Sequence, residues 1–417
     1  MGPLFPLEDA LLVVDRSVRP VAGRESVPLA SAAGRVLAES VRSDVDAPPF
    51  DRSAVDGYAV RSRDLARVPA MLRVDRVVAA GDAPGRSRLG PALAARIFTG
   101  APVPAGADAV VMQEATRGPE RPVVPGDLVM FLERTGAGKN VSPRAEHLRR
   151  GSVPLRPGTL VGPPEIAVLA SVGKTIVSVL RRVRVALLAT GDELVPPGSR
   201  PAPGRLRNSN TLAARAAFEG LPVETTDLGI VGDDAAALER LVRRGLEHDV
   251  LVLSGGVSVG DRDLVLPALR AAGVRIHFHG LKLKPAKPTL FGGAPGGRAF
   301  AVGLPGNPVS SFVAAELIAK RVVKRLAGCP VKAHSPIAAR SAEALPPGGS
   351  RAELRPARVE VSPDGRLVAR PVPFRGSADF PGLLAADAFI VRPVGARAVR
   401  KGGAVRVHLL PGRGILA

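Results

Sequence analysis

The chain has 417 residues, 46% of them apolar and 23% charged, so it is long enough for about two to four folded domains and is not a disordered protein. Lys and Arg exceed Asp and Glu by 20, but no basic tail collects this charge, and aromatic residues make up only 3%. A nucleic-acid partner is therefore not expected, because it would need a concentrated basic surface and stacking rings. The single cysteine excludes a disulfide framework within the chain.

The first 181 residues predict a mixture of helical and β-rich segments. Residues 7–18 predict an amphipathic helix, and residues 28–40 predict either a second helix or a turn. From residue 50 to about 145, short apolar runs alternate with Gly, Pro and Asp turns, which is typical of a small β-rich domain. Pro163-Pro164 and the apolar residues after it predict another helix.

From residue 182 the pattern changes to strands that alternate with helices. The predicted strands are 182–189, 223–230, 250–253, 274–279 and 299–304, and the predicted helices are 210–220, 233–247, 263–272 and 309 to about 326. This alternation predicts a doubly wound, mostly parallel α/β sheet. After residue 332, strand-like runs at 351–361, 367–371, 388–394 and 404–410 predict a C-terminal β domain.

No uncharged apolar run approaches the ~18 residues of a membrane span. The N-terminus also lacks the basic first part of a signal peptide. We therefore expect a cytoplasmic protein without a membrane partner.

In an open α/β sheet, ligands bind beyond the carboxyl ends of the strands. Three predicted strands run into the loops 190–194 (TGDEL), 254–263 (SGGVSVGDRD) and 304–308 (LPGNP). These loops leave the same edge of the sheet, so they can converge on one site.

The loop 254–263 has the composition of an anion-binding turn. Gly255 and Gly256 let the backbone approach a ligand, and free N–H groups ahead of a helix bind anions. Ser254 and Ser258 add hydroxyl groups. The alternative is a plain tight turn between a strand and a helix. The string matches neither a Walker A loop nor a dinucleotide fingerprint.

Four carboxylates follow the neighbouring strand ends: Asp192, Glu193, Asp261 and Asp263. Clustered carboxylate oxygens beside a phosphate site are typical ligands of Mg²⁺. The alternative is helix capping, which is the favoured interpretation for Asp233 and Asp234 ahead of a predicted helix. Zinc is not expected, because no histidines are paired at a metal-binding spacing.

Lysine is scarce, with nine in the chain, yet three lie between residues 282 and 287. An ammonium is a compact, strongly hydrated charge that suits phosphate or another oxyanion. We therefore interpret Lys284 and Lys287 as anion-binding residues, with a solvated edge strand as the alternative. A further dense segment, residues 47–60, offers oxygens from Asp51, Ser53 and Asp56, with a structural turn as its alternative.

Taken in order, six motifs resemble those of the molybdopterin molybdenumtransferase family, which is related to the E domain of gephyrin. They are residues 47–60, 96–113, 190–194, 254–263, 283–288 and 304–308, and the likeness runs from about residue 5 to 415. The resemblance implies an elongated mixed domain (1–45 and 146–181), a β-rich inserted domain (46–145), an α/β molybdopterin-binding domain (182–331) and a C-terminal β-barrel-like domain (332–417). It also implies a homodimer whose cleft is shared between protomers.

The resemblance further implies that adenylylated molybdopterin and molybdate are the substrates, and that AMP is released with Mg²⁺ as cofactor. By motif, the functional positions are Asp56, Thr99, Glu193, Asp263, Lys284, Lys287, Pro305, Pro308 and Ser377, with Gly306 and Asn307 inside the same proline motif. We expect Asp56, Asp263, Lys284 and Lys287 to be catalytic, and the loop residues, Thr99 and Ser377 to bind substrate.

The sequence departs from this family at one position. Relatives carry Gly-Glu-Asp where this chain has Ala145-Glu146-His147, so an imidazole replaces a carboxylate. The favoured hypothesis is that His147 is peripheral; the alternative is an altered pH dependence, because imidazole titrates near neutrality. Two other functions stay open: a molybdopterin adenylyltransferase, and a non-catalytic cofactor carrier or scaffold.

Overall fold

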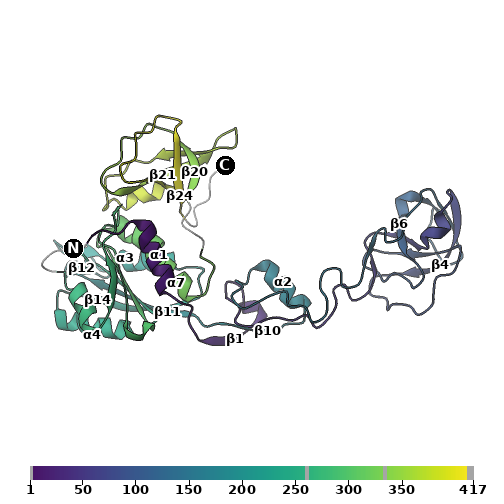
Figure 1. The fold of residues 1–417 in the computed structure, drawn as a ribbon, viewed down its shortest axis with the longest axis horizontal. Coiled ribbons are helices and arrows are strands. Elements are labelled where there is room, and N and C mark those ends of the chain that lie inside the picture. Colours follow the sequence, from purple (N-terminus) through teal and green to yellow (C-terminus); the bar gives the residue numbers. More distant parts are fainter. Residues whose placement is uncertain (1–2, 259–262, 332–335, 411–417) are drawn as a thin grey trace. The chain divides into compact units, whose positions relative to one another are not determined.

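The computed structural model describes residues 3–258, 263–331 and 336–410 (Figure 1). The chain divides into two compact units. The large unit contains Met1–Ala38, Gly158–Gly162 and Val177–Ala417, and the small unit contains Glu39–Pro157 and Pro163–Ile176. The described residues include no helix that is long and apolar enough to cross a membrane.

The large unit is built on a six-stranded sheet with the order β14-β11-β15-β19-β18-β16. The bounds of these strands are β11 Val183–Thr190, β14 Val223–Val231, β15 Val250–Ser254, β16 Arg275–His279, β18 Leu290–Gly293 and β19 Phe300–Leu304. Strands β14, β11, β15 and β19 are parallel, and β18 pairs antiparallel with both β19 and β16, so β18 alone runs against the other strands of this sheet. The prediction of a doubly wound, mostly parallel sheet is confirmed.

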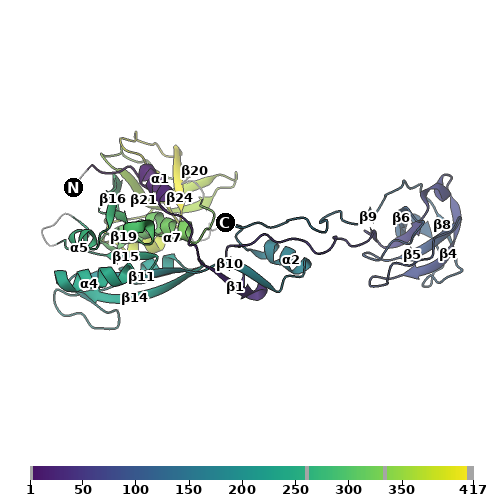
Figure 2. The same cartoon turned by 60° about the horizontal axis from the view of Figure 1, so that its bottom comes forward.

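Helices cover both faces of this sheet, and Figure 2 shows the same elements from a second side. The bounds are α1 Leu7–Ser17, α3 Asn210–Ala217, α4 Ala235–Gly245, α5 Val265–Ala271, α6 Pro308–Ala314 and α7 Lys320–Leu326. Successive strand residues point to opposite faces of the sheet, so the strands contribute to two hydrophobic cores. Val185 and Val252 pack with α1, α3, α6 and α7 in one core, and Leu188 and Leu253 pack with α4 and α5 in the other. This two-sided burial explains why the central strands are apolar at nearly every position.

The structure tests two predictions about helices, the cap at Asp234 and the helix 309–326. Asp234 caps α4, since its side chain accepts the backbone N–H groups of Ala236 and Ala237. The predicted helix 309–326 forms as α6 and α7 joined by one π-helical segment, η5 (Ala315–Ala319).

The C-terminal residues form a closed five-stranded barrel. Its strands are β20 Ile337–Ser341, β21 Ala352–Val361, β22 Leu367–Pro371, β23 Ala388–Arg392 and β24 Ala404–Leu409. The order β21-β22-β20-β24-β23 closes through a β21–β23 pairing. Strand β17 (Leu283–Lys284) pairs in parallel with the start of β21. This pairing brings the lysine-rich segment to the barrel.

The rest of the large unit consists of short elements. Two of them are two-stranded pairs: β1 (Arg24–Pro28) with β10 (Ile176–Leu180), and β12 (Leu194–Val195) with β13 (Leu206–Arg207). The others are the 3₁₀ turns η1 (Leu29–Ser31), η4 (Pro295–Gly297) and η6 (Pro381–Ala385). For residues 28–40 the turn interpretation is right and the helix is wrong. Gly34 has φ +76°, which ends any right-handed helix, and Val36 and Leu37 then pair as isolated bridges.

The small unit contains a second six-stranded sheet, with the order β6-β3-β5-β4-β8-β7. The bounds are β3 Gly57–Val60, β4 Ala70–Val78, β5 Leu93–Ile97, β6 Ala109–Met112, β7 Thr116–Arg117 and β8 Leu128–Phe131. The unit also holds the pair β2 (Arg52–Ser53) with β9 (Val141–Ser142), the turns η2 (Ser62–Leu65) and η3 (Gln113–Ala115), and helix α2 (Pro163–Ser171). The four-domain division itself stays a prediction.

Candidate functional site

The loops that follow β11, β15 and β19 line one cavity of about 660 Å³. Its lining includes Glu193 from the first loop, Gly256, Ser258 and Asp263 from the second, and Pro305 to Pro308 from the third. Each loop leaves the carboxyl end of a parallel strand, so the sheet topology brings together residues that are far apart in the sequence.

Two of the predicted ligand-binding residues lie behind this cavity rather than in its lining. Ser254 is buried, and its hydroxyl accepts from Nδ2 of Asn210 at 3.0 Å. Gly255 has φ +93°, and a Cβ there would lie 2.4 Å from the carbonyl oxygen of Thr190. The Gly255 position therefore needs glycine for loop packing, and ligand contact is not required to explain it.

Asn210 is a residue that sequence reasoning missed. Its Nδ2 group donates to Ser254 Oγ at 3.0 Å and to the carbonyl oxygen of Gly306 at 2.8 Å. One amide thus ties the loop after β15 to the loop after β19. Asn208, Ser209 and Asn210 together carry only a weak sequence signal, since such residues are also common ahead of helices.

The four predicted metal ligands differ in position. Glu193 and Asp263 line the cavity, whereas Asp192 accepts the backbone N–H of Asp233 at 3.1 Å and is absent from the lining. Asp263 precedes Leu264, the N-cap of α5. Asp261 lies outside the described residues. Among the residues that are described, no group of three His, Cys, Asp or Glu side chains is arranged to hold a metal.

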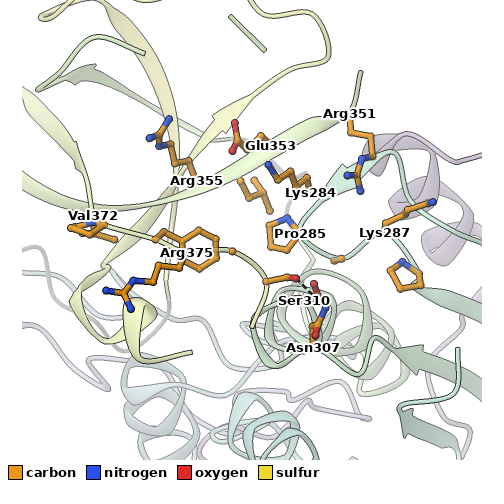
Figure 3. A pocket seen from close by; sticks show the side chains of 17 residues that line it. Lys284, Pro285, Lys287, Asn307, Ser310, Arg351, Glu353, Arg355, Val372 and Arg375 are labelled. Carbon is orange, nitrogen blue, oxygen red and sulfur yellow. Dashed lines mark hydrogen bonds between the residues drawn. The ribbon is translucent and has the colours of Figure 1, made fainter. Parts of the chain in front are cut away.

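A second cavity of about 530 Å³, drawn in Figure 3, adjoins the first. Pro288, Asn307 and Ser310 line both cavities. Its lining carries five basic side chains and one acid: Lys284, Lys287, Arg351, Arg355, Arg375 and Glu353. Arg351, Glu353 and Arg355 share one face at the start of β21, as the alternation of a strand requires. The cavity is therefore strongly positive.

Hydrogen bonds hold the lysine segment and a barrel loop at this cavity. The backbone N–H of Leu281 donates to the Lys287 carbonyl at 2.7 Å, and the Thr289 hydroxyl donates to the Ala286 carbonyl at 2.8 Å. On the opposite wall, Asn307 Nδ2 donates to Ser377 Oγ at 3.0 Å (Figure 3). The edge-strand alternative is thus true of β17, yet Lys284 and Lys287 still line the cavity.

The arginines of this cavity were missed by sequence reasoning. Arginine greatly outnumbers lysine in this chain, so the presence of a single arginine does not indicate a binding site. Alternation of Arg351, Glu353 and Arg355 along a predicted strand is a signal that could have found the first two of these arginines, Arg351 and Arg355, and nothing comparable marks Arg375. Ser310, one turn into α6, had no signal at all.

In the small unit, Asp56 and Thr99 form a hydrogen-bonded pair. The backbone N–H and the hydroxyl of Thr99 both donate to Oδ1 of Asp56 at 2.7 Å. These two bonds, the backbone one first, hold the pKa of the Asp56 carboxyl below its usual value, with a further contribution from the charge of Arg96. Asp56 is exposed, so its charge is available to a ligand or metal.

We expect Thr99→Val to raise the pKa of Asp56 part of the way towards that of an ordinary aspartate, because the hydroxyl donor is lost and the backbone donor stays. Carbon-detected NMR titration of the Asp56 carboxyl measures this. Asp46 is the internal control, since a separate bond from the Arg150 N–H lowers its pKa. An unchanged Asp56 pKa would show that the backbone bond alone is responsible.

His147 has an exposed side chain, 58% accessible, with Nε2 3.8 Å from Oε2 of Glu146. Its backbone N–H donates to the Ala47 carbonyl at 2.9 Å, and Glu146 accepts a hydrogen bond from Ser142. The substituted position therefore keeps a neighbouring carboxylate, as the peripheral hypothesis requires. That hypothesis stays a prediction.

A parallel-sheet edge with carboxylates, next to a basic cavity, defines an α/β protein built for an anionic ligand. Family models match residues 5–173 (MoeA N-terminal region, domain I and II), 186–325 (probable molybdopterin binding domain) and 338–410 (MoeA C-terminal region, domain IV). Molybdopterin molybdenumtransferase of Bacillus subtilis is 34% identical, over 95% of this chain and 94% of the relative. The Haemophilus influenzae protein of that name is 32% identical, over 88% and 89%.

Solved structures agree with these relatives. Two structures of molybdopterin biosynthesis moeA protein from Pyrococcus horikoshii superimpose with TM-scores of 0.77 and 0.74, at 28% and 32% identity. Each match covers 98% of this chain and 100% of the other. The chain belongs to the molybdopterin molybdenumtransferase family and is an enzyme of molybdenum-cofactor biosynthesis.

Proposed function

We propose that this enzyme inserts molybdenum from molybdate into adenylylated molybdopterin, with Mg²⁺-dependent release of AMP. The observation that carries the proposal is the junction of the two cavities at Pro288, Asn307 and Ser310. One cavity offers positive charge for an oxyanion, and the other offers carboxylates beside a loop suited to phosphate. A substrate that presents a phosphoanhydride next to a metal-accepting group fits both.

The basic cavity is the proposed molybdate site. Molybdate is a small tetrahedral dianion, and ammonium and guanidinium groups bind such oxyanions through charge-assisted hydrogen bonds. Lys284 and Lys287 approach from the α/β side, and Arg351, Arg355 and Arg375 approach from the barrel. Ser310 and Ser377 supply hydroxyl donors on the wall shared with Asn307.

The carboxylate cavity is the proposed site of the phosphoanhydride. Glu193 and Asp263 are hard oxygen donors of the kind that Mg²⁺ prefers, and Asp261 is a further candidate from the same loop. When bound, Mg²⁺ would neutralise the charge of the phosphate oxygens. The backbone and hydroxyl of Ser258 can hold the phosphate, and Asn210 keeps the two loops in register.

The resemblance supplies two further parts of the proposal. Asp56 with Thr99 would contact the substrate or orient water, and two copies of the chain would share the cleft as a homodimer. Sedimentation velocity tests the dimer directly. We also keep the proposal that neither a nucleic acid nor a membrane is a partner.

The decisive experiment measures AMP release from adenylylated molybdopterin, with and without molybdate and Mg²⁺. Release that needs both supports the proposal. A carrier would bind the substrate without releasing AMP, and an adenylyltransferase would consume ATP and molybdopterin instead. Either result would replace the proposed reaction.

Within this proposal we expect Asp263→Asn to raise the Mg²⁺ concentration for half-maximal turnover several-fold, because an amide offers an oxygen without charge. The measurement is a Mg²⁺ titration of AMP release. The matched control is Asp364→Asn in the exposed turn between β21 and β22, for which the titration should not move. An identical titration for Asp263→Asn with an intact fold would exclude a metal role.

A further inference from the structure

A third cavity, of about 550 Å³, lies entirely within the small unit. Strands β3, β4 and β5 contribute to its walls, together with the segment that includes η3 and β7. Its principal lining residues are Tyr58, Val77, Arg96, Phe98, Gln113 and Thr116. None of the motifs discussed above assigns it a ligand.

The centre of this cavity is a guanidinium held between two aromatic rings. The Cζ atom of Arg96 lies 4.7 Å from the ring centroid of Phe98 and 5.3 Å from that of Tyr58. Arg96 also donates to the Gly57 carbonyl at 2.9 Å and to Gln113 Oε1 at 2.7 Å. Tyr58 packs edge-on against Phe131 in the core. The guanidinium plane is therefore fixed before any ligand arrives.

Apolar surface is left open around this fixed group. Phe98 is 37% exposed and Val77 is 41% exposed, although both line a cavity. Exposed aromatic faces of this kind stack on planar rings. Phe98 thus offers a stacking surface that the fold itself leaves partly uncovered.

The polar groups suit a ring with a hydrogen-bonding edge rather than a strongly charged group. Arg121 is held by two bonds to Asp127, at 2.7 and 2.8 Å, and Glu114 opposes the charge of Arg96. Arg96 engages only Oε1 of Gln113, so the amide nitrogen can still donate. The cavity is nearly balanced in charge and has donors beside a flat surface.

We propose that this cavity binds a bicyclic nitrogen heterocycle of the substrate, stacked on the exposed surface of Phe98. The inference rests on the proposed function, because adenylylated molybdopterin carries two such rings, an adenine and a pterin. Thr99 follows Phe98 directly, and the carbonyl of Asp56 accepts the backbone N–H of Gln113 at 3.2 Å. A ring bound here would therefore lie beside the Asp56–Thr99 pair.

The chain provides its own probe of this site. It contains no tryptophan, and Tyr58 is its single tyrosine, so tyrosine emission reports on this cavity alone. The full-length protein is titrated with adenosine, with a hydroxymethyl pterin and with ribose phosphate, and free tyrosine corrects for absorption by the ligands. We expect a saturable change with at least one heterocycle and none with ribose phosphate. The ring that binds more tightly identifies which half of the substrate occupies the cavity.

The matched variants are Phe98→Leu and Leu128→Ala. Phe98→Leu keeps an apolar side chain and removes the ring, so binding should weaken roughly 5- to 150-fold, the effect of losing one stacked base. Leu128 is an exposed apolar residue of the same sheet outside the cavity lining, and its replacement should leave binding unchanged. Circular dichroism checks that both variants keep their β structure.

Two results would overturn the inference: no saturable response to either heterocycle, or a response that Phe98→Leu leaves intact. Either could occur while molybdate-dependent AMP release is normal, in which case the cavity assignment fails alone. Ring binding without any AMP release would instead contradict the proposed reaction and leave the cavity assignment standing.

Discussion

Replacing Lys287 with Gln is expected to lower molybdate-dependent AMP release about 10- to 150-fold, the usual effect of losing one hydrogen bond to a charged group. Lys287 is one of the five basic side chains that line the second cavity, and its side chain is exposed (Figure 3). Glutamine keeps the polarity and much of the length of the side chain but removes the charge. The loss should appear mainly as a higher molybdate requirement.

The control for this prediction is Lys401→Gln, which removes the same charge from an exposed barrel turn outside the cavity lining. It lowers the net charge of the chain equally, so it separates a local effect from a general one. Equal activity of the two variants at limiting molybdate would contradict the assignment of the basic cavity.

The second large effect concerns stability. We expect Asp249→Ala to destabilise the large unit by about 3 kcal/mol, the lower end for breaking a buried ion pair, because Arg181 stays partly exposed. Asp249 is buried immediately before β15, and both of its oxygens accept from Arg181 at 2.7 Å. One oxygen also accepts the backbone N–H of Arg184 at 2.8 Å. The variant removes the acceptor of the Arg184 N–H and of Arg181 Nη2, while Arg181 Nη1 keeps its bond to the Arg182 carbonyl.

The measurement is urea unfolding followed by circular dichroism, with amide exchange in β15 as a local readout. Glu239→Gln is the control in the same unit, because its pair with Arg243 is exposed and should contribute less than about 0.5 kcal/mol. Tyr58 emission reports on the small unit and should show an unchanged transition. Equal stability of both variants would mean that Asp249 is not a structural charge.

The same aspartate predicts a pH dependence. Burial acts to raise the pKa of Asp249, but the Arg181 bonds and the Arg184 N–H outweigh it and hold the pKa below the usual value. A depressed carboxyl pKa stabilises the folded state above the unfolded pKa of about 3.8, and this stability is lost as pH falls through the folded pKa. As pH falls, the free energy of unfolding of Asp249→Ala should therefore decrease less steeply than that of the unaltered protein.

Local patterns in the sequence were sufficient for much of the fold. Residues 185–189 and 250–253 are apolar at successive positions, which indicated strands buried on both faces, and the loops after them could be placed at one sheet edge. For residues 28–40 the apolar spacing left a helix and a turn both open, and the structure shows the turn, with Gly34 at φ +76°.

For the candidate site, too, the sequence indicated some residues and the tertiary structure decided others. Residue type and strand position indicated Glu193, Asp263, Lys284 and Lys287, because carboxylates and scarce lysines carry their own chemistry. Whether a side chain lines the cavity depended on contacts far along the chain. Ser254 is turned inward by Asn210, Asp192 is held by Asp233, and Arg351 and Arg355 reach the lysines only because β21 pairs with β17. A sequence records the periodicity of one segment, whereas the direction of a loop side chain and the partner of an edge strand are set by packing between segments.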